Sequence, residues 1–113
     1  MNLSSERTQG VVIIRVGEAK LMYPMLSDFS ESISALVAEG ESKVVIDMSQ
    51  VSYVDSASIG CLMDLYRQTT QAGGSLKLAG VQKRVETMLT MTGTQNFIEL
   101  HADEAAAISS FGE

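Results

Sequence analysis

The stretch from Val44 to Tyr66 constrains the fold more than any other part of the sequence. It begins with the β-branched run Val44-Val45-Ile46, which predicts a buried strand. Apolar residues later recur at helical spacing, namely Ile59, Leu62, Met63 and Tyr66. Asp55 and Ser56 therefore lie where a helix begins. The first N–H groups of a helix lack partners and the helix dipole is positive there, so this position favours a capping side chain and accommodates a phosphate.

The remaining sequence predicts alternating strands and helices. The expected strands are Val11–Val16, Val44–Met48, Leu76–Ala79 and Phe97–Leu100, with a short strand or irregular segment over Ala19–Met22. Helical patterns follow Pro24, Ser56, Val81 and Asp103, and Gly40, Gly73 and Gly93 are their expected ends. This order predicts an α/β fold with a four- to five-stranded, mostly parallel sheet and about four helices. Functional groups in such folds gather beyond the carboxyl ends of the strands, where the Asp55-Ser56 turn is expected.

A family resemblance rests on Asp55-Ser56-Ala57-Ser58-Ile59-Gly60, with a strand before it and a helix, Gly73-Gly74, a strand and a second helix after it. This order resembles a STAS domain of the anti-sigma factor antagonist type, whose pattern is Asp-Ser-(small)-Gly-(Leu/Ile)-Gly. Ser58 stands where the family usually has glycine. The resemblance runs from about Val11 to the C-terminus and implies the STAS fold. We expect residues 1–113 to form a single domain, with residues 1–10 frayed unless they contribute to a first strand.

The resemblance also implies a function. Ser56 would be the phosphoacceptor, modified by a serine kinase that is itself an anti-sigma factor and restored by a serine phosphatase. The residues expected to bind this partner are Asp55, Ser56, Ala57, Ser58 and Glu18. Glu18 belongs to a loop that reads Gly-Glu-Leu-Asp in the family, and here Ala19 and Lys20 replace the last two residues.

Structural interpretations of the same residues stay open. Ser56 has the alternative of a simple helix cap. Asp55 either caps the helix or holds the Ser56 hydroxyl for a kinase. Ser58 is either a second acceptor near the docking surface or an ordinary serine of the first helical turn. Asp47, at the end of the central strand, either joins Asp55 at the same loop face or bonds within its own turn.

Composition excludes several classes of function. Lys and Arg number 8 against 14 Asp and Glu, giving a net charge of −6, so we expect no nucleic-acid partner. The sequence contains no long apolar run and no signal peptide at its start, which predicts a cytoplasmic protein without a membrane partner. Cys61 and His101 are the only residues of their kinds, so we expect no catalytic residues, metal site or cofactor. Cys61 is expected to be structural.

Two rival functions remain from the sequence. A STAS subunit of a lipid or anion transporter, or of a signalling scaffold, would not be switched at Ser56. An aspartate-phosphorylated receiver or a small enzyme is disfavoured, because Arg15-Val16-Gly17-Glu18 supplies no acidic cluster at the end of the first strand. We expect a monomer or a weak homodimer.

Overall fold

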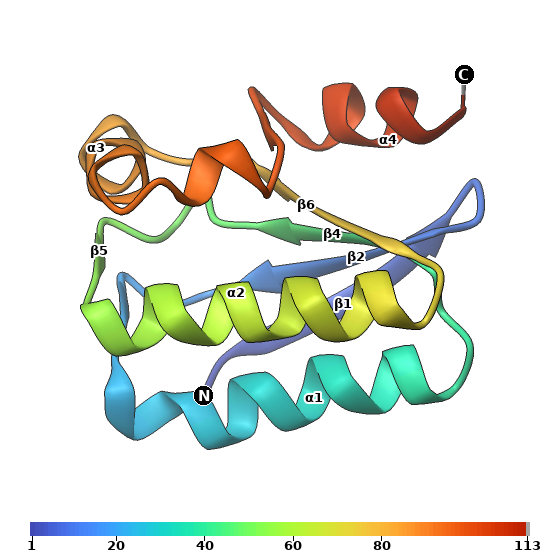
Figure 1. The fold of residues 1–113 in the computed structure, drawn as a ribbon, viewed down its shortest axis with the longest axis horizontal. Helices are drawn as coiled ribbons and strands as arrows, with labels where there is room; N and C mark the ends of the chain where they lie inside the picture. Colours follow the sequence, from blue (N-terminus) through green and yellow to red (C-terminus); the bar gives the residue numbers. More distant parts are fainter. Residues whose placement is uncertain (113) are drawn as a thin grey trace.

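A five-stranded sheet divides the structure, a computed structural model that describes residues 1–112 (Figure 1). In spatial order its strands are β1 (Leu3–Thr8), β2 (Val11–Val16), β4 (Lys43–Asp47), β6 (Ser75–Ala79) and β7 (Leu100–His101). β1 is antiparallel to β2, whereas the other neighbouring strands are parallel. The expected α/β fold with a mostly parallel sheet is thereby confirmed.

Four α-helices cover the sheet unequally. They are α1 (Leu26–Ala38), α2 (Ser56–Gln71), α3 (Lys83–Met91) and α4 (Glu104–Gly112), with 3-10 turns η1 (Tyr23–Met25) and η2 (Thr94–Asn96). α1 and α2 lie side by side along one face, and α4 crosses the opposite face (Figure 1). Within residues 1–112, no helix combines the length and apolarity that a membrane crossing requires.

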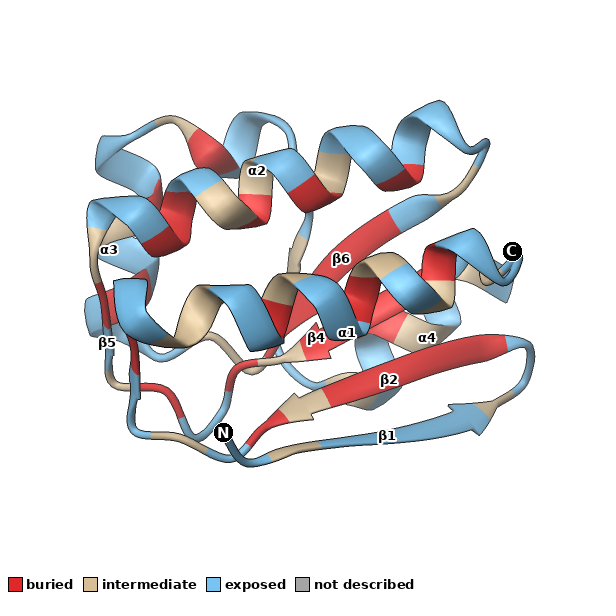
Figure 2. Cartoon of the chain, turned by 90° about the horizontal axis from the view of Figure 1, so that it is seen from below, coloured by how far each residue is buried: buried red, intermediate tan, exposed pale blue. Residues whose placement is uncertain are grey.

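The two faces of the sheet bury two separate apolar clusters. Alternate residues of β2 point to opposite sides, so that Val12 and Ile14 face α1 and α2 while Val11 and Ile13 face α4. The first cluster is the larger and also receives Val85 and Leu89 of α3. β2 is therefore buried along most of its length, as its nearly continuous apolar sequence predicts (Figure 2).

The N-terminal segment takes the second of the two expected forms, a contribution to a first strand. Residues 3–8 do not fray, because Leu3–Thr8 pairs along its whole length with Val16–Val11. Gln9 and Gly10 form the two-residue turn, with φ values of 54° and 79°. Two consecutive positive φ values are typical of the turn type that matches the twist of a hairpin. The strand's polar side chains lie on an exposed edge of the sheet (Figure 2).

The last strand is shorter and later than expected. It comprises Leu100–His101, whereas Phe97 ends the 3-10 turn η2 and is exposed. Ile98 is nevertheless buried in the large cluster, which explains the apolar signal of this segment. A second, two-stranded sheet joins β3 (Lys20–Leu21) to β5 (Tyr53–Val54), so the short strand expected within residues 19–22 exists.

Candidate functional site

Asp55 caps α2, and Ser56 is the first residue of the helix. The Asp55 backbone is extended, and its Oδ1 accepts the N–H of Ser58 at 2.8 Å. Val54 before it and Ile59 after it are both buried, which fixes the turn between β5 and α2 against the core. The interpretation of Ser56 as the cap is therefore wrong, and Asp55 fills that role.

The Asp55 carboxylate also connects α2 to the segment before α1. Its Oδ2 accepts the backbone N–H of Tyr23 at 3.0 Å. The Ser58 hydroxyl lies 2.6 Å from Asp55 Oδ1 and, together with the Tyr23 and Ser58 N–H groups, holds the pKa of Asp55 below its ordinary value. Asp55 is thus ionised and accepts hydrogen bonds from Tyr23 and Ser58, and not from the Ser56 hydroxyl.

Ser58 points into the molecule. Its exposed fraction is 0%, and its Oγ lies 2.5 Å from the carbonyl oxygen of Leu21. Of the two interpretations of Ser58, this placement agrees with a serine of the first helical turn that packs inward. As the structure stands, the Ser58 hydroxyl is closed to a kinase.

Ser56 and Ala57 lie on the surface at the start of α2. Within residues 1–112 the Ser56 hydroxyl makes no hydrogen bond, so it points to solvent without a partner in the fold. The exposed ring of Tyr23, at 73%, belongs to the segment that Asp55 fastens to this helix start. The structure therefore combines a free hydroxyl, a small residue and an exposed aromatic ring at one end of the molecule.

Glu18 lies two residues before β3, which pairs with β5 just ahead of Asp55. The carbonyl of the following residue, Ala19, accepts the N–H of Ser52 at 2.8 Å, so this loop is joined to the loop before β5. The Glu18 carboxylate accepts the N–H of Asn2 at 2.7 Å. The structure gives Glu18 no contact with Asp55 or Ser56.

A groove between α1 and α2 escaped the sequence analysis. Its lining comprises Tyr23, Leu26, Ser27 and Ser30 on the α1 side, and Ala57, Gly60, Cys61, Asp64, Leu65 and Gln68 on the α2 side. The volume is about 460 Å³, and Ala57 places one end beside Ser56. One indication of this groove was present in the sequence, namely the small residues Ala57, Gly60 and Cys61. Their short side chains leave space on the outer face of α2. Burial, and then Asp64, raise the pKa of the half-buried Cys61 thiol.

Asp47 belongs to a different polar cluster. Its Oδ1 accepts the Ser49 N–H at 2.8 Å, as the turn interpretation predicts. Burial, and then the neighbouring Glu104 carboxyl group, raise the pKa of Asp47. Glu104 receives two hydrogen bonds from Arg15, at 2.8 and 2.9 Å, and these lower its pKa to about 2. Asp47 therefore lies beside Glu104 at the start of α4 and not beside Asp55.

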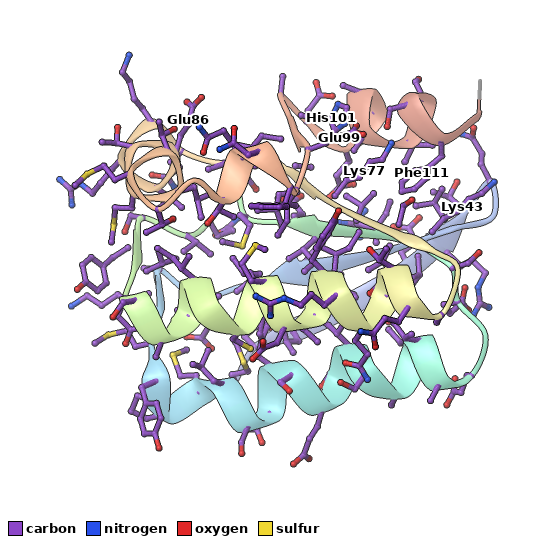
Figure 3. The ribbon with its side chains drawn as sticks, in the orientation of Figure 1. Lys43, Lys77, Glu86, Glu99, His101 and Phe111 are labelled. Atoms are coloured by element: carbon purple, nitrogen blue, oxygen red, sulfur yellow. The ribbon has the colours of Figure 1, made fainter. Side chains whose placement is uncertain are left out.

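A second charged cluster lies between the sheet and the other end of α4 (Figure 3). The Lys77 Nζ is 4.2 Å from the centre of the Phe111 ring, 2.6 Å from the Ser110 hydroxyl and 3.3 Å from Glu99. His101 also contacts Glu99 at 3.0 Å, and His101 and Lys77 together lower the pKa of Glu99. Since every member has a partner within the fold, this cluster fastens α4 to the sheet.

Comparison with known families decides the classification. A profile of the STAS domain matches residues 2–107. The chain belongs to the STAS domain family. Its relatives include the anti-sigma-B factor antagonist of Bacillus subtilis, which is 28% identical over 72 residues, or 64% of this chain and 66% of the relative. The matched segment thus spans just under two thirds of that protein.

Solved STAS structures show the same fold. An anti-sigma factor antagonist from Mycobacterium paratuberculosis superposes with a TM-score of 0.89 at 19% identity, covering 99% of this chain and 94% of the other. The phosphorylated form of the Bacillus cell fate determinant SpoIIAA superposes with a TM-score of 0.74 at 19% identity, covering 97% and 99%. The resemblance expected from the Asp55–Gly60 motif is confirmed, and the relatives are regulatory proteins by name.

Proposed function

We propose that this STAS domain is an anti-sigma factor antagonist switched by phosphorylation of Ser56. Unphosphorylated, it binds a serine kinase that is also an anti-sigma factor and so frees the sigma factor. Phosphorylation on Ser56 ends that binding, and a serine phosphatase restores it. The domain catalyses no step of this cycle, which takes place in the cytoplasm.

One observation carries the proposal, namely that Ser56 is exposed and unbonded at the end of the α1–α2 groove while the neighbouring Ser58 is buried. Of the two serines in this motif, only Ser56 therefore presents its hydroxyl to a kinase. SpoIIAA, which shares the fold, has a solved phosphorylated form.

The physical effect of the phosphate follows from its surroundings. It adds about −1.5 to −2 units of charge. The first turn of α2 tolerates this charge, because its N–H groups and the helix dipole favour anions. Asp55 and the groove residue Asp64 are also acidic, so the phosphate deepens the negative potential at the groove. A partner shaped around a neutral hydroxyl is then repelled while the fold stays intact.

The test is a binding titration of three proteins against the anti-sigma kinase encoded nearest to this gene. Ser56→Ala should bind as tightly as the unmodified protein and resist phosphorylation. Ser56→Asp, which carries less charge than a phosphate, should bind more weakly by about 30- to 150-fold, equivalent to about 2–3 kcal/mol.

The matched control is Ser109→Asp, which adds the same charge to an exposed serine on α4. It should leave the affinity unchanged, and circular dichroism should show all four proteins folded. Equal affinities for Ser56→Ala and Ser56→Asp would contradict the switch and favour a STAS subunit that is not regulated at Ser56. Phosphate mapped to Ser58 would contradict the assignment of the acceptor.

A further inference from the structure

Ser58 connects segments that are far apart in the sequence. Its Oγ lies 2.5 Å from the Leu21 carbonyl oxygen, 37 residues away, and 2.6 Å from Asp55 Oδ1. A hydroxyl has one proton to donate, so these two acceptors share it. The site is fully buried, so removing the hydroxyl leaves the Leu21 carbonyl and Asp55 without this donor in a place closed to bulk solvent.

Asp55 extends this connection to Tyr23 through its other oxygen, Oδ2. We call Leu21, Tyr23, Asp55 and Ser58 the Ser58 clasp. Tyr23 lines the α1 side of the groove and Ala57 lines the α2 side. The clasp therefore joins the two sides of the groove at the end where Ser56 is exposed.

We propose that Ser58 is a positioning residue that fixes Tyr23 and Ser56 in one arrangement before a partner binds. Glycine, the usual family residue at this place, has no side chain with which to make these contacts. A surface that is already ordered loses less conformational entropy when a partner binds, and the smaller loss raises the affinity. The effect on a kinase rests on the function proposed above, whereas the ordering of Tyr23 is a property of the free protein.

The clasp also predicts which kinetic constant Ser58 controls. The hydrogen bonds of the Asp55 carboxylate come from Tyr23 and Ser58 and not from the Ser56 hydroxyl, so Asp55 does not hold the proton of Ser56 in the free protein. We expect the general base for phosphoryl transfer to come from the kinase. Loss of the clasp should accordingly raise KM and leave kcat unchanged.

The first measurement uses the free protein. Residue-resolved amide hydrogen exchange compares the wild type with Ser58→Gly and Ser58→Ala. Tyr23 N–H should exchange about tenfold faster in both variants, the effect of losing about 1.4 kcal/mol of hydrogen bonding. The N–H of Ser52, which bonds to Ala19 in the adjoining loop, should keep its rate. An unchanged Tyr23 rate, or equal acceleration at both amides, would overturn the proposal.

Ser52→Ala is the matched control, because the Ser52 hydroxyl also donates to a backbone carbonyl, that of Ala19 at 3.1 Å, without touching Asp55. It should leave Tyr23 exchange at the wild-type rate. Any acceleration at Tyr23 as large as that in Ser58→Gly would mean that loosening of the loop, and not the clasp, controls Tyr23.

The second measurement is phosphorylation of the same variants by the neighbouring anti-sigma kinase. Ser58→Gly should raise KM about tenfold with kcat within about twofold, and Ser52→Ala should change neither. A lower kcat at unchanged KM, or an unchanged KM despite faster Tyr23 exchange, would overturn the role in partner binding. A wild type that is not phosphorylated would refute the proposed switch, while the exchange data would still decide whether Ser58 orders Tyr23.

Discussion

Ser56 and Ser58 lie two positions apart and have opposite environments. One is exposed on the first turn of α2, and the other donates within a closed contact to Leu21. The difference follows from helix geometry, because residues two apart point about 200° away from each other. The side of α2 that faces the core thus determines which hydroxyl a kinase can reach.

Asp47 provides a prediction at this scale. The pKa of Asp47 in the folded protein is above the ordinary value of 3.8. The folded state therefore gives up this proton less readily than the unfolded state, and the protein loses stability as the pH rises from 3.8 through the pKa of the folded state. Asp47→Asn should therefore make the fold more stable than the wild type at neutral pH, because the amide stays neutral. The amide oxygen still accepts the Ser49 N–H, and the amide NH₂ group donates to Glu104.

Urea unfolding at several pH values measures this effect. The advantage of Asp47→Asn should shrink on acidification and vanish below about pH 3.8, where the aspartate is protonated in both states. Asp64→Asn, which changes an exposed carboxylate paired with Arg67, is the control and should stay within about 0.5 kcal/mol of the wild type. A variant less stable than the wild type at neutral pH would show that the charge of Asp47 is favourable.

The sequence predicted part of this site. Asp55 as a cap was among the alternatives, because Asp before a helical pattern is a local signal. The burial of Ser58 was not predictable, because it depends on Leu21, a contact that only the pairing of β3 with β5 creates. The attachment of Asp47 to Glu104 was missed for the same reason, since α4 must first dock on the sheet.

The helix α2 carries the candidate phosphoacceptor Ser56 and also lines one side of the groove. Gly60 lies in this helix, and a Cβ at that position would meet nothing within 4 Å. Gly60→Ala should therefore stabilise the protein by about 0.5–1 kcal/mol, because alanine is the better helix former. The added methyl group enters the groove, so affinity for the anti-sigma kinase should fall by about tenfold.

Thermal unfolding and the same binding titration test both parts of this prediction. Ser109→Ala, another exposed helical change to alanine but on α4, should not affect binding. Equal affinity for Gly60→Ala and the wild type would mean that the partner does not enter the groove. Loss of stability would mean that Gly60 has a structural role not visible in its surroundings.

Element boundaries were predictable where the signal is local and failed where it is not. The apolar runs of β2, β4 and β6 located those strands nearly to the residue. The segment Phe97–Glu99 has a strand-like sequence, but β7 comprises only Leu100–His101. Ile98 is buried in the large cluster, and only the Glu99 carbonyl, which accepts the Leu78 N–H at 3.0 Å, continues the pairing with β6. The sequence did not clearly predict β1, because LSSERT lacks the apolar run that marks a buried strand. Such polar sequences are typical of exposed edge strands.

For the molecule as a whole, the two faces of the sheet differ in how firmly they are covered. α1 and α2 close one face over the large cluster, whereas α4 covers the other with Ala107 as its one fully buried residue within 104–112. Polar contacts complete the docking of α4, from Arg15 to Glu104 at one end and from Lys77 to Ser110 at the other. Sequence periodicity predicted α4 but not these two contacts. Arg15 and Glu104 are 89 positions apart, and Lys77 and Ser110 are 33 positions apart.

The turn at Gln9-Gly10 has a consequence for the order of folding. Hairpin closure there joins neighbours in the sequence, whereas β2 can pair with β4 only after the chain through α1 has been enclosed. An isolated hairpin is only marginally stable, so β1–β2 would act as a transient nucleus that β4 later stabilises.

Gly10→Ala should then slow folding about fivefold, the effect of about 1 kcal/mol of strain at φ 79°, with unfolding within about twofold. Gly40→Ala carries similar strain at φ 103° after α1 and should mainly speed unfolding. Stopped-flow chevron plots measure the folding and unfolding rates of each variant. If Gly10→Ala changed its folding and unfolding rates by the same factor, an early hairpin would be refuted. On the ribosome, β1 and β2 emerge before β4, so the hairpin can begin to pair before β4 has been synthesised.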